Sequence, residues 1–134
     1  MEKIFNYIDG KLIEPTSKKF IDNYNPAKGE VYSLIPNSDD KDVELAYQAA
    51  ESAFEGWSNT PKEERSNIML KIAQLIDDNL DELALAESID NGKPVKLAAH
   101  VDIPRAASNM RFYATAILHQ ATESHHMDGG FVNY

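Results

Sequence analysis

The residues with the most obvious capacity for chemistry are the histidines near the C-terminal end of the sequence. His119, His125 and His126, with Glu123 between them, could supply ligands to a metal ion. A zinc pair on a helix places two histidines at i and i+4, and the sequence contains no HExxH motif or equivalent. We therefore interpret these residues as exposed loop positions and predict no transition-metal site.

Paired carboxylates are the second candidate for chemistry. Asp39-Asp40 and Asp77-Asp78 are adjacent in sequence, and adjacent helix positions point apart, so a helix start or a solvated face explains them better than an acid–base pair. No glycine-rich phosphate loop follows a strand, and no Gly-x-Ser-x-Gly elbow or convincing Ser/His/Asp order is present. Residue chemistry alone therefore predicts no active site within the chain.

Composition narrows the class of protein. The 134 residues carry a formal net charge of −9 and include no cysteine. The negative field disfavours nucleic acid and anionic lipid as partners, and the missing thiols exclude disulfides, zinc–thiolate sites and a cysteine nucleophile. The balance of apolar and charged residues is typical of one soluble domain or a piece of a larger one, and we expect no membrane partner and a cytoplasmic location.

Residues 1–36 have the pattern of a small β-hairpin element. Alternating apolar residues flank Asp9-Gly10, a dipeptide suited to a tight hairpin turn. A second pair of strands is expected on either side of the turn at 26–29, and Pro36 should end the last strand. Such short strands are marginally stable alone, so their apolar face should pack against another element.

From residue 38 to residue 121 the period becomes helical. Ser38 is the expected N-cap of the first helix, and the segment Thr60-Pro61-Lys62-Glu63 has the form of a capping box for the second. The second helix is predicted to bend near Asn79 and to end at Asn91-Gly92. The first helix carries a continuous apolar stripe, which should be buried: Val43, Ala46, Tyr47, Ala50, Ala53, Phe54 and Trp57.

The third helical stretch should begin near Pro94 and restart at Pro104, since a proline amide cannot join the helical hydrogen-bond ladder. Its buried side should carry seven apolar residues: Ile103, Ala107, Met110, Ala114, Ile117, Leu118 and Ala121. After Thr122 the pattern weakens, and residues 131–134 resemble the start of a strand without a partner.

Six segments in order resemble the N-terminal region of the NAD(P)-dependent aldehyde dehydrogenases. The phrases are FNYIDGKLIEP, NYNPAKGEVYSLIPNSD, VELAYQAAESAFEGWS, TPKEERSNIMLKIAQLIDDN, ESIDNGKP, and NMRFYA followed by FVNY. The segment DIPRAASNMRFYA, with the later ATESHHMDG, is most similar to the branch that oxidises muconic-type semialdehydes. The resemblance implies an α/β fold of the aldehyde dehydrogenase type. This chain would be mainly α-helical, with the N-terminal β-hairpin element and an incomplete C-terminal strand.

The resemblance also implies which domains of the enzyme the chain contributes to. Residues 1–124 would form the N-terminal part of the dinucleotide-binding domain, and residues 125–134 would start the strand of the oligomerisation domain. The nucleophilic cysteine, the general-base glutamate and the cofactor loop would lie beyond Tyr134, so the chain alone should be inactive and bind no NAD or NADP. Its expected partners are the remainder of the enzyme and further copies in a homo-oligomer.

Two sites follow from the resemblance. It places Asp90 beside the main-chain carbonyls of Asn23 and Tyr24, an oxygen set suited to a structural Na⁺ or K⁺. For the isolated chain we interpret Asp90 instead as a cap of the Asn91-Gly92 turn through its carboxylate. It also places Arg105 at the mouth of the aldehyde tunnel, where a guanidinium could bind the carboxylate of an acidic semialdehyde. The alternative for Arg105 is an exposed helix-start arginine paired with Asp102.

A second interpretation assigns the chain to another functional class. Apolar helical faces that find a new arrangement by self-association would make the chain a helical interaction module without catalytic activity.

Overall fold

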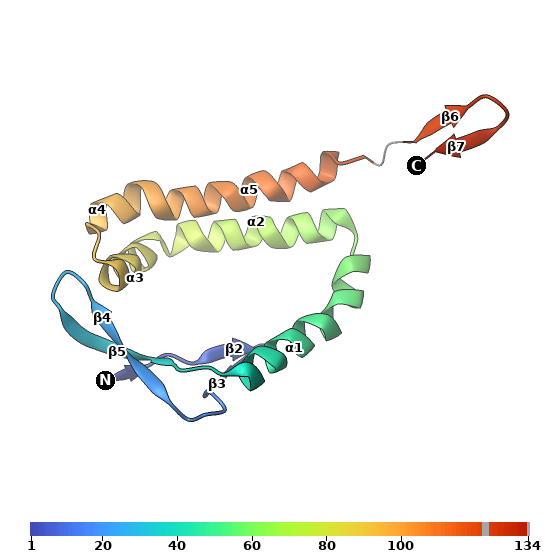
Figure 1. Ribbon diagram of the computed structural model, residues 1–134. Coiled ribbons are helices and arrows are strands. Elements are labelled where there is room, and N and C mark those ends of the chain that lie inside the picture. The colour runs from blue at the N-terminus through green and yellow to red at the C-terminus, as the bar shows by residue number, and fades with distance from the viewer. Residues whose placement is uncertain (122–123, 134) are drawn as a thin grey trace.

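The computed structural model describes residues 1–121 and 124–133, and it forms an open arrangement of β elements and long helices (Figure 1). The elements in chain order are β1 (Glu2–Lys3), β2 (Asn6–Ile8), β3 (Lys11–Ile13), β4 (Phe20–Asn25), β5 (Glu30–Pro36), α1 (Asp40–Asn59), α2 (Lys62–Asp78), α3 (Leu80–Asn91), α4 (Val95–Leu97), the π-helical turn η1 (Ala98–Asp102), α5 (Ile103–His119), β6 (His125–Met127) and β7 (Phe131–Asn133).

The N-terminal strands confirm the predicted β element. β2 and β3 pair antiparallel around Asp9 and Gly10, whose φ values of 52° and 72° are those of a turn with both central residues left-handed. β4 and β5 pair antiparallel as expected, and β1 adds to β5 in parallel, giving the sheet order β1-β5-β4.

The start of α1 corrects the expected cap. Asp39, and not Ser38, is the N-cap: its carboxylate accepts from the Lys41 amide, and the Asp42 side chain accepts from the Asp39 amide in return. Asp42 also accepts from the amide of Thr16 at 2.9 Å, which fixes the chain before β4 against the helix start. The Ser38 hydroxyl instead hydrogen-bonds the amide of Asn6.

The start of α2 differs from the expected capping box. Pro61 is the N-cap residue, and its hydrocarbon ring has no acceptor with which to cap the helix. The Thr60 hydroxyl, the expected cap, donates instead to the Gly56 carbonyl of the preceding helix. The predicted bend at Asn79 is a complete break between α2 and α3, and Gly92 ends α3 with a φ of 79° as expected.

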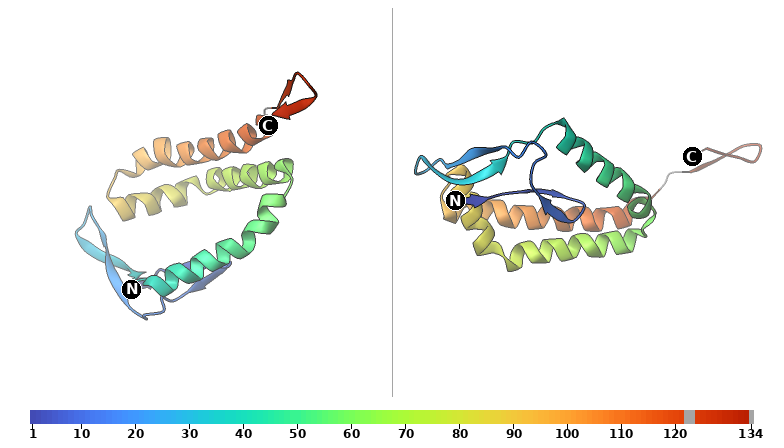
Figure 2. Two further views of the ribbon diagram at one scale, coloured as in Figure 1. Left: turned by 45° about the vertical axis from the view of Figure 1, so that its right-hand side comes forward. Right: turned by 90° about the horizontal axis from the view of Figure 1, so that it is seen from below.

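α2 and α5 lie side by side and antiparallel in both views of the helices (Figures 1 and 2). Small buried side chains line their contact and permit close approach of the two backbones: Ser66, Ala73, Ala107 and Ala114. An ion pair between Arg111 and Asp77 and a hydrogen bond from Lys62 to the Gln120 carbonyl join the same two helices. The expected burial is confirmed for Ala107 and Ala114, and Ile103 and Ile117 are half-buried. It is wrong for Met110, Leu118 and Ala121, which are exposed because α5 is covered by α2 on one narrow side.

The apolar stripe of α1 is not buried as expected. Val43, Tyr47, Phe54 and Trp57 keep 65%, 58%, 68% and 45% of their surface exposed. Apart from Pro15, the fully buried apolar residues in the described part of the chain are all alanines: Ala73, Ala84, Ala98, Ala107 and Ala114. The periodicity correctly predicts that α1 is amphipathic, but no other described element covers its apolar face.

The C-terminal segment also differs from expectation in one respect. β7 has a partner, since it pairs antiparallel with β6 around a turn containing Gly129 and Gly130 at positive φ. This hairpin extends away from the helices (Figure 2). The sequence of β6, His-His-Met, does not alternate apolar and polar residues and so does not predict a strand. Tyr134 lies outside the described residues.

Candidate functional site

Two groups of polar side chains meet at the corner where α3 passes through α4 and η1 into α5. The first joins Asp90 to the β4–β5 hairpin, and the second surrounds Lys93 and Asp102. α3, α4 and the tip of this hairpin lie at the same end of the molecule (Figure 1). The corner also holds both sites that the resemblance implied, around Asp90 and at Arg105.

Asp90 is hydrogen-bonded to two side chains of the hairpin. Its Oδ1 accepts from the Tyr32 hydroxyl at 2.5 Å and from the Asn23 amide at 3.0 Å. The same amide nitrogen lies 2.9 Å from the Tyr32 oxygen and 3.2 Å from the Ser33 hydroxyl. These contacts span residues distant in sequence and tie the end of α3 to β4 and β5.

A β-bulge directs Tyr32 to this position. Asn23 pairs with Ser33 and Tyr24 pairs with Val31, so Tyr32 is the extra residue on β5. A bulge breaks the strict alternation of side chains and re-aims the extra residue. The alternation of apolar and polar residues in β5 does not reveal the bulge, so the sequence pattern predicts no role for Tyr32.

The hydrogen bonds shift the ionisation of both partners. Donation by the Tyr32 hydroxyl, with that of the Asn23 amide, lowers the pKa of Asp90 below its usual value. The pKa of Tyr32 is raised, chiefly because its proton is held by Asp90 and also because the phenol is desolvated. The pair is therefore a carboxylate and a neutral phenol around neutral pH.

The expected cation ligands Asn23, Tyr24 and Asp90 lie where β4 contacts the end of α3. Asn23 contacts Asp90 through its side-chain amide, and Tyr24 follows it directly at the bulge. Oδ2 of Asp90 has no hydrogen-bond partner in the described part of the chain, which leaves one anionic oxygen beside the irregular strand. A carboxylate oxygen is a hard donor of the kind that such a cation accepts.

Lys93 is shared between two carboxylates. Its ammonium lies 2.7 Å from Oδ2 of Asp102 and 2.9 Å from Oε1 of Glu87. Hydrogen bonding to Asp102 and then to Glu87 raises the pKa of Lys93, so it is cationic at any physiological pH. Sequence reasoning overlooked Lys93, although it lies within the ESIDNGKP phrase.

Arg105 lies on the first turn of α5, with 68% of its side chain exposed. One guanidinium nitrogen is 3.4 Å from Oδ1 of Asp102, three residues earlier. The structure therefore contains the pairing with Asp102 that the sequence offered as an alternative. The single long contact leaves the other guanidinium donors of Arg105 without a partner among the described residues.

The wide turn η1 leads into α5, which begins at Ile103 with Pro104 in its first turn, next to the expected restart. The amide of Ile103 bonds to the carbonyl of Ala98, five residues earlier, in place of the α-helical spacing of four. A π turn of this kind is common at functional sites and re-phases the residues that follow it. Asp102 ends the turn and faces Lys93 on one side and Arg105 on the other.

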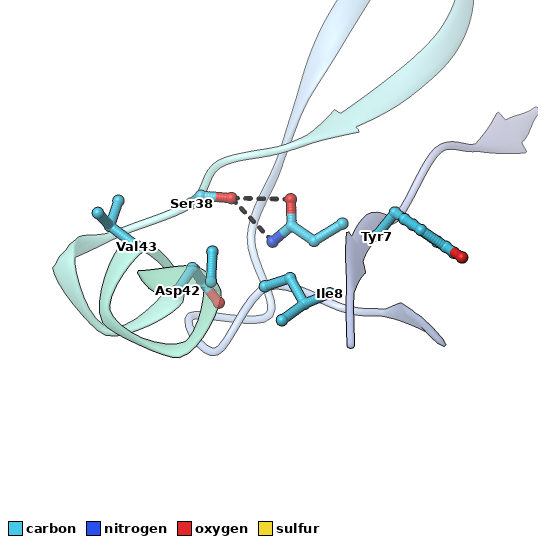
Figure 3. Close-up of a pocket in the computed structure, with 7 residues that line it drawn as sticks. Tyr7, Ile8, Ser38, Asp42 and Val43 are labelled. Carbon is cyan, nitrogen blue, oxygen red and sulfur yellow. Dashed lines mark hydrogen bonds between the residues drawn. The ribbon is translucent and has the colours of Figure 1, made fainter. Parts of the chain in front are cut away.

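A separate hollow of about 240 Å³ lies between β2 and the start of α1 (Figure 3). Ser38 hydrogen-bonds Asn6 within it, while the oxygens of the buried Asp42 are occupied by the main-chain amides of Thr16 and Asp39. Since its carboxylate is already satisfied, Asp42 is a structural group and not a poised base.

Most of the histidine group lies outside what the structure describes, namely Glu123 and the side chains of His125 and His126. Among the described side chains, no three of His, Asp or Glu gather as a metal-binding group. Residues 1–121 and 124–133 contain no helix long and apolar enough to cross a membrane.

The comparisons with known proteins agree on one family. The model described as "Aldehyde dehydrogenase family" matches residues 12–134. The 2-aminomuconic semialdehyde dehydrogenase of Bos taurus is 46% identical over 123 residues, which are 92% of this chain and 25% of that protein. An aldehyde dehydrogenase of Vibrio cholerae is 40% identical over 129 residues, 96% of this chain and 26% of that protein.

Solved structures agree as well. The NAD⁺ complex of an aldehyde dehydrogenase from Bacillus cereus superposes with a TM-score of 0.93 at 31% identity, covering 98% of this chain and 27% of that one. The chain thus spans about a quarter of the length of the relatives it matches.

Proposed function

Because this chain belongs to the aldehyde dehydrogenase family, we propose that it serves an intact enzyme that oxidises an aldehyde to an acid with NAD or NADP. The chain has no cysteine, and its described residues offer no glycine-rich loop between a strand and a helix. The dinucleotide, which accepts the hydride when bound, would accordingly be held by other residues of the enzyme, as would the aldehyde under attack. The contribution of this chain is support and substrate recognition.

We further propose that the substrate is a carboxylated semialdehyde and that Arg105 binds its carboxylate. The observation that carries this proposal is the exposed guanidinium of Arg105, held by one contact at 3.4 Å. Its planar donors suit a carboxylate, and such a charge-assisted pair gains strength where water is partly excluded. Relatives named for 2-aminomuconic semialdehyde, at 44% and 46% identity, support the same class of substrate.

The test is a comparison of two aldehydes of equal chain length in the intact enzyme, 6-oxohexanoate and hexanal. Arg105→Ala should lower kcat/KM for 6-oxohexanoate roughly 10- to 150-fold, about 1.5 to 3 kcal/mol, and leave hexanal almost unchanged. The matched control is Lys96→Ala, which removes a nearby exposed cation on α4 and should affect neither substrate. Equal losses on both aldehydes with Arg105→Ala would show a structural role for Arg105 instead.

A structural cation is also part of the proposal. Asp90, with the main-chain oxygens of Asn23 and Tyr24, would hold Na⁺ or K⁺ at the junction of α3 and β4. The unpartnered Oδ2 of Asp90 supports this, whereas the two donors on Oδ1 show that the junction has hydrogen bonds of its own.

One observation favours a second candidate function, that of a self-associating helical module. Tyr47, Phe54 and Trp57 form an exposed apolar face on α1 that no described element covers. Light scattering of the 134-residue chain at micromolar concentration tests it: dimers or larger species are expected, and a compact monomer would exclude the module. The same face could instead pack against the remainder of the enzyme or a second subunit, with residues 125–134 joining the oligomer contact.

A further inference from the structure

Asp102 stands between two cations but does not hold them equally. Its Oδ2 is 2.7 Å from the Lys93 ammonium, whereas its Oδ1 is 3.4 Å from a single nitrogen of Arg105. Attraction between charges falls with distance, and a closer N–H···O contact is the stronger bond. Asp102 is therefore bound chiefly to Lys93.

The exposed fractions of Lys93, Asp102 and Arg105 support the same conclusion. The side chains of Lys93 and Asp102 are only 25% and 20% exposed, and Glu87 fixes Lys93 from its other side at 2.9 Å. Arg105 extends from this half-buried group into solvent. The carboxylate is thus held in place by Lys93, while the guanidinium is held loosely.

Without Lys93 the geometry would favour a different pairing. Arginine binds carboxylates best through two parallel N–H···O bonds, and a residue three positions away on a helix is within its reach. A carboxylate already engaged by an ammonium has less charge and one oxygen fewer to offer in such a pair. Lys93 therefore competes with Arg105 for Asp102.

We propose that Lys93 is a positioning residue for substrate recognition: by holding Asp102, it prevents Arg105 from closing into a bidentate pair and keeps the guanidinium available for the carboxylate of the substrate. This inference rests on the proposed role of Arg105. It adds that the specificity of the site depends on a lysine that touches neither the substrate nor Arg105.

The experiment uses the intact enzyme with 6-oxohexanoate and hexanal. Lys93→Met should raise KM for 6-oxohexanoate about tenfold, with kcat and the kinetics of hexanal nearly unchanged, because the freed Asp102 closes onto Arg105. Lys93→Arg, which keeps the charge, should behave as the parent enzyme. The double variant Lys93→Met/Asp102→Asn should regain a KM within about threefold of the parent, because the asparagine no longer neutralises Arg105.

Three results would overturn the inference. These are a parental KM for 6-oxohexanoate in Lys93→Met, equal damage on both aldehydes that the second substitution does not relieve, or a selective tenfold rise in KM in Asp102→Asn alone. The last would show that Asp102 must hold Arg105 for binding. Arg105→Ala separates this inference from the proposed function: a selective loss there with no effect of Lys93→Met rejects only the role of Lys93, and no selective loss rejects the role of Arg105 itself.

Discussion

The Tyr32 hydroxyl donates to Oδ1 of Asp90 at 2.5 Å and joins residues 58 positions apart in the sequence. The contact connects the β4–β5 hairpin to the end of α3, and Asn23 reinforces it. The first group at the corner thus depends on a donor that only the bulge of β5 supplies.

The first prediction concerns pH. The lowered pKa of Asp90 means that its contribution to stability is present above the ordinary carboxyl value near ~3.9 and is lost as pH falls through the lower folded value. The raised pKa of Tyr32 means the converse: its contribution is present below about 10 and is lost as the pH rises through the folded value. Denaturant titrations between about pH 3 and about pH 11 should show that the difference in free energy of unfolding between the parent and Tyr32→Phe shrinks at both extremes. A difference independent of pH would contradict this assignment.

The second prediction concerns Gly92. Its φ is 79°, and a Cβ there would lie 3.1 Å from Cβ of Pro26 and 3.3 Å from the amide nitrogen of Ala27. Gly92→Ala should therefore destabilise the chain by about 2 kcal/mol, through left-handed strain and the contact with the hairpin. The matched control is Gly56→Ala in α1, where nothing lies within 4 Å and a gain of about 0.5 to 1 kcal/mol is expected. Urea unfolding measures both, and equal effects would contradict the prediction.

The third prediction concerns the contact of α2 with α5. Ala114 is fully buried there, so Ala114→Leu should overpack the contact and destabilise it by about 1 to 3 kcal/mol. Ala116, two residues further along α5, is exposed, and Ala116→Leu should be nearly neutral. Thermal unfolding of the two variants checks this, and a neutral Ala114→Leu would mean that the helices are further apart than the structure shows.

The fourth prediction concerns the proposed cation. If Asp90 ligates Na⁺ or K⁺, added potassium should raise the Tm of the intact enzyme, and Asp90→Ala should abolish that rise because binding to the native state stabilises it. Choline chloride at equal ionic strength is the control for screening. An undiminished potassium effect in Asp90→Ala would eliminate the site, while a loss of stability without any potassium effect would leave the hydrogen bonds as the sole role of Asp90.

Local features of the fold could be read from the sequence because they depend on neighbouring residues. Asp9-Gly10 and Gly92 adopt the left-handed conformations that their residue types favour, and the break at Asn79 lies where the apolar pattern falters. The predicted caps were wrong, because the side chains of Ser38 and Thr60 hydrogen-bond to Asn6 and to the Gly56 carbonyl instead. A capping side chain can bond to any of several nearby donors and acceptors, and the spacing of residues in the sequence does not show which of them is closest.

The sequence alone is enough to predict the N-terminal β element and the helices that follow it, to show that the chain has no thiol, and to reveal a family resemblance that the comparisons confirmed. Tertiary structure alone decided that Tyr32 meets Asp90 across a bulge, and that Lys93 takes the larger share of Asp102. It also decided that the apolar stripe of α1 lies open. Turns and helical periods arise from interactions between residues that are close in sequence. A register shift, a shared carboxylate and the covering of an apolar face each depend on where segments distant in sequence lie in the folded chain.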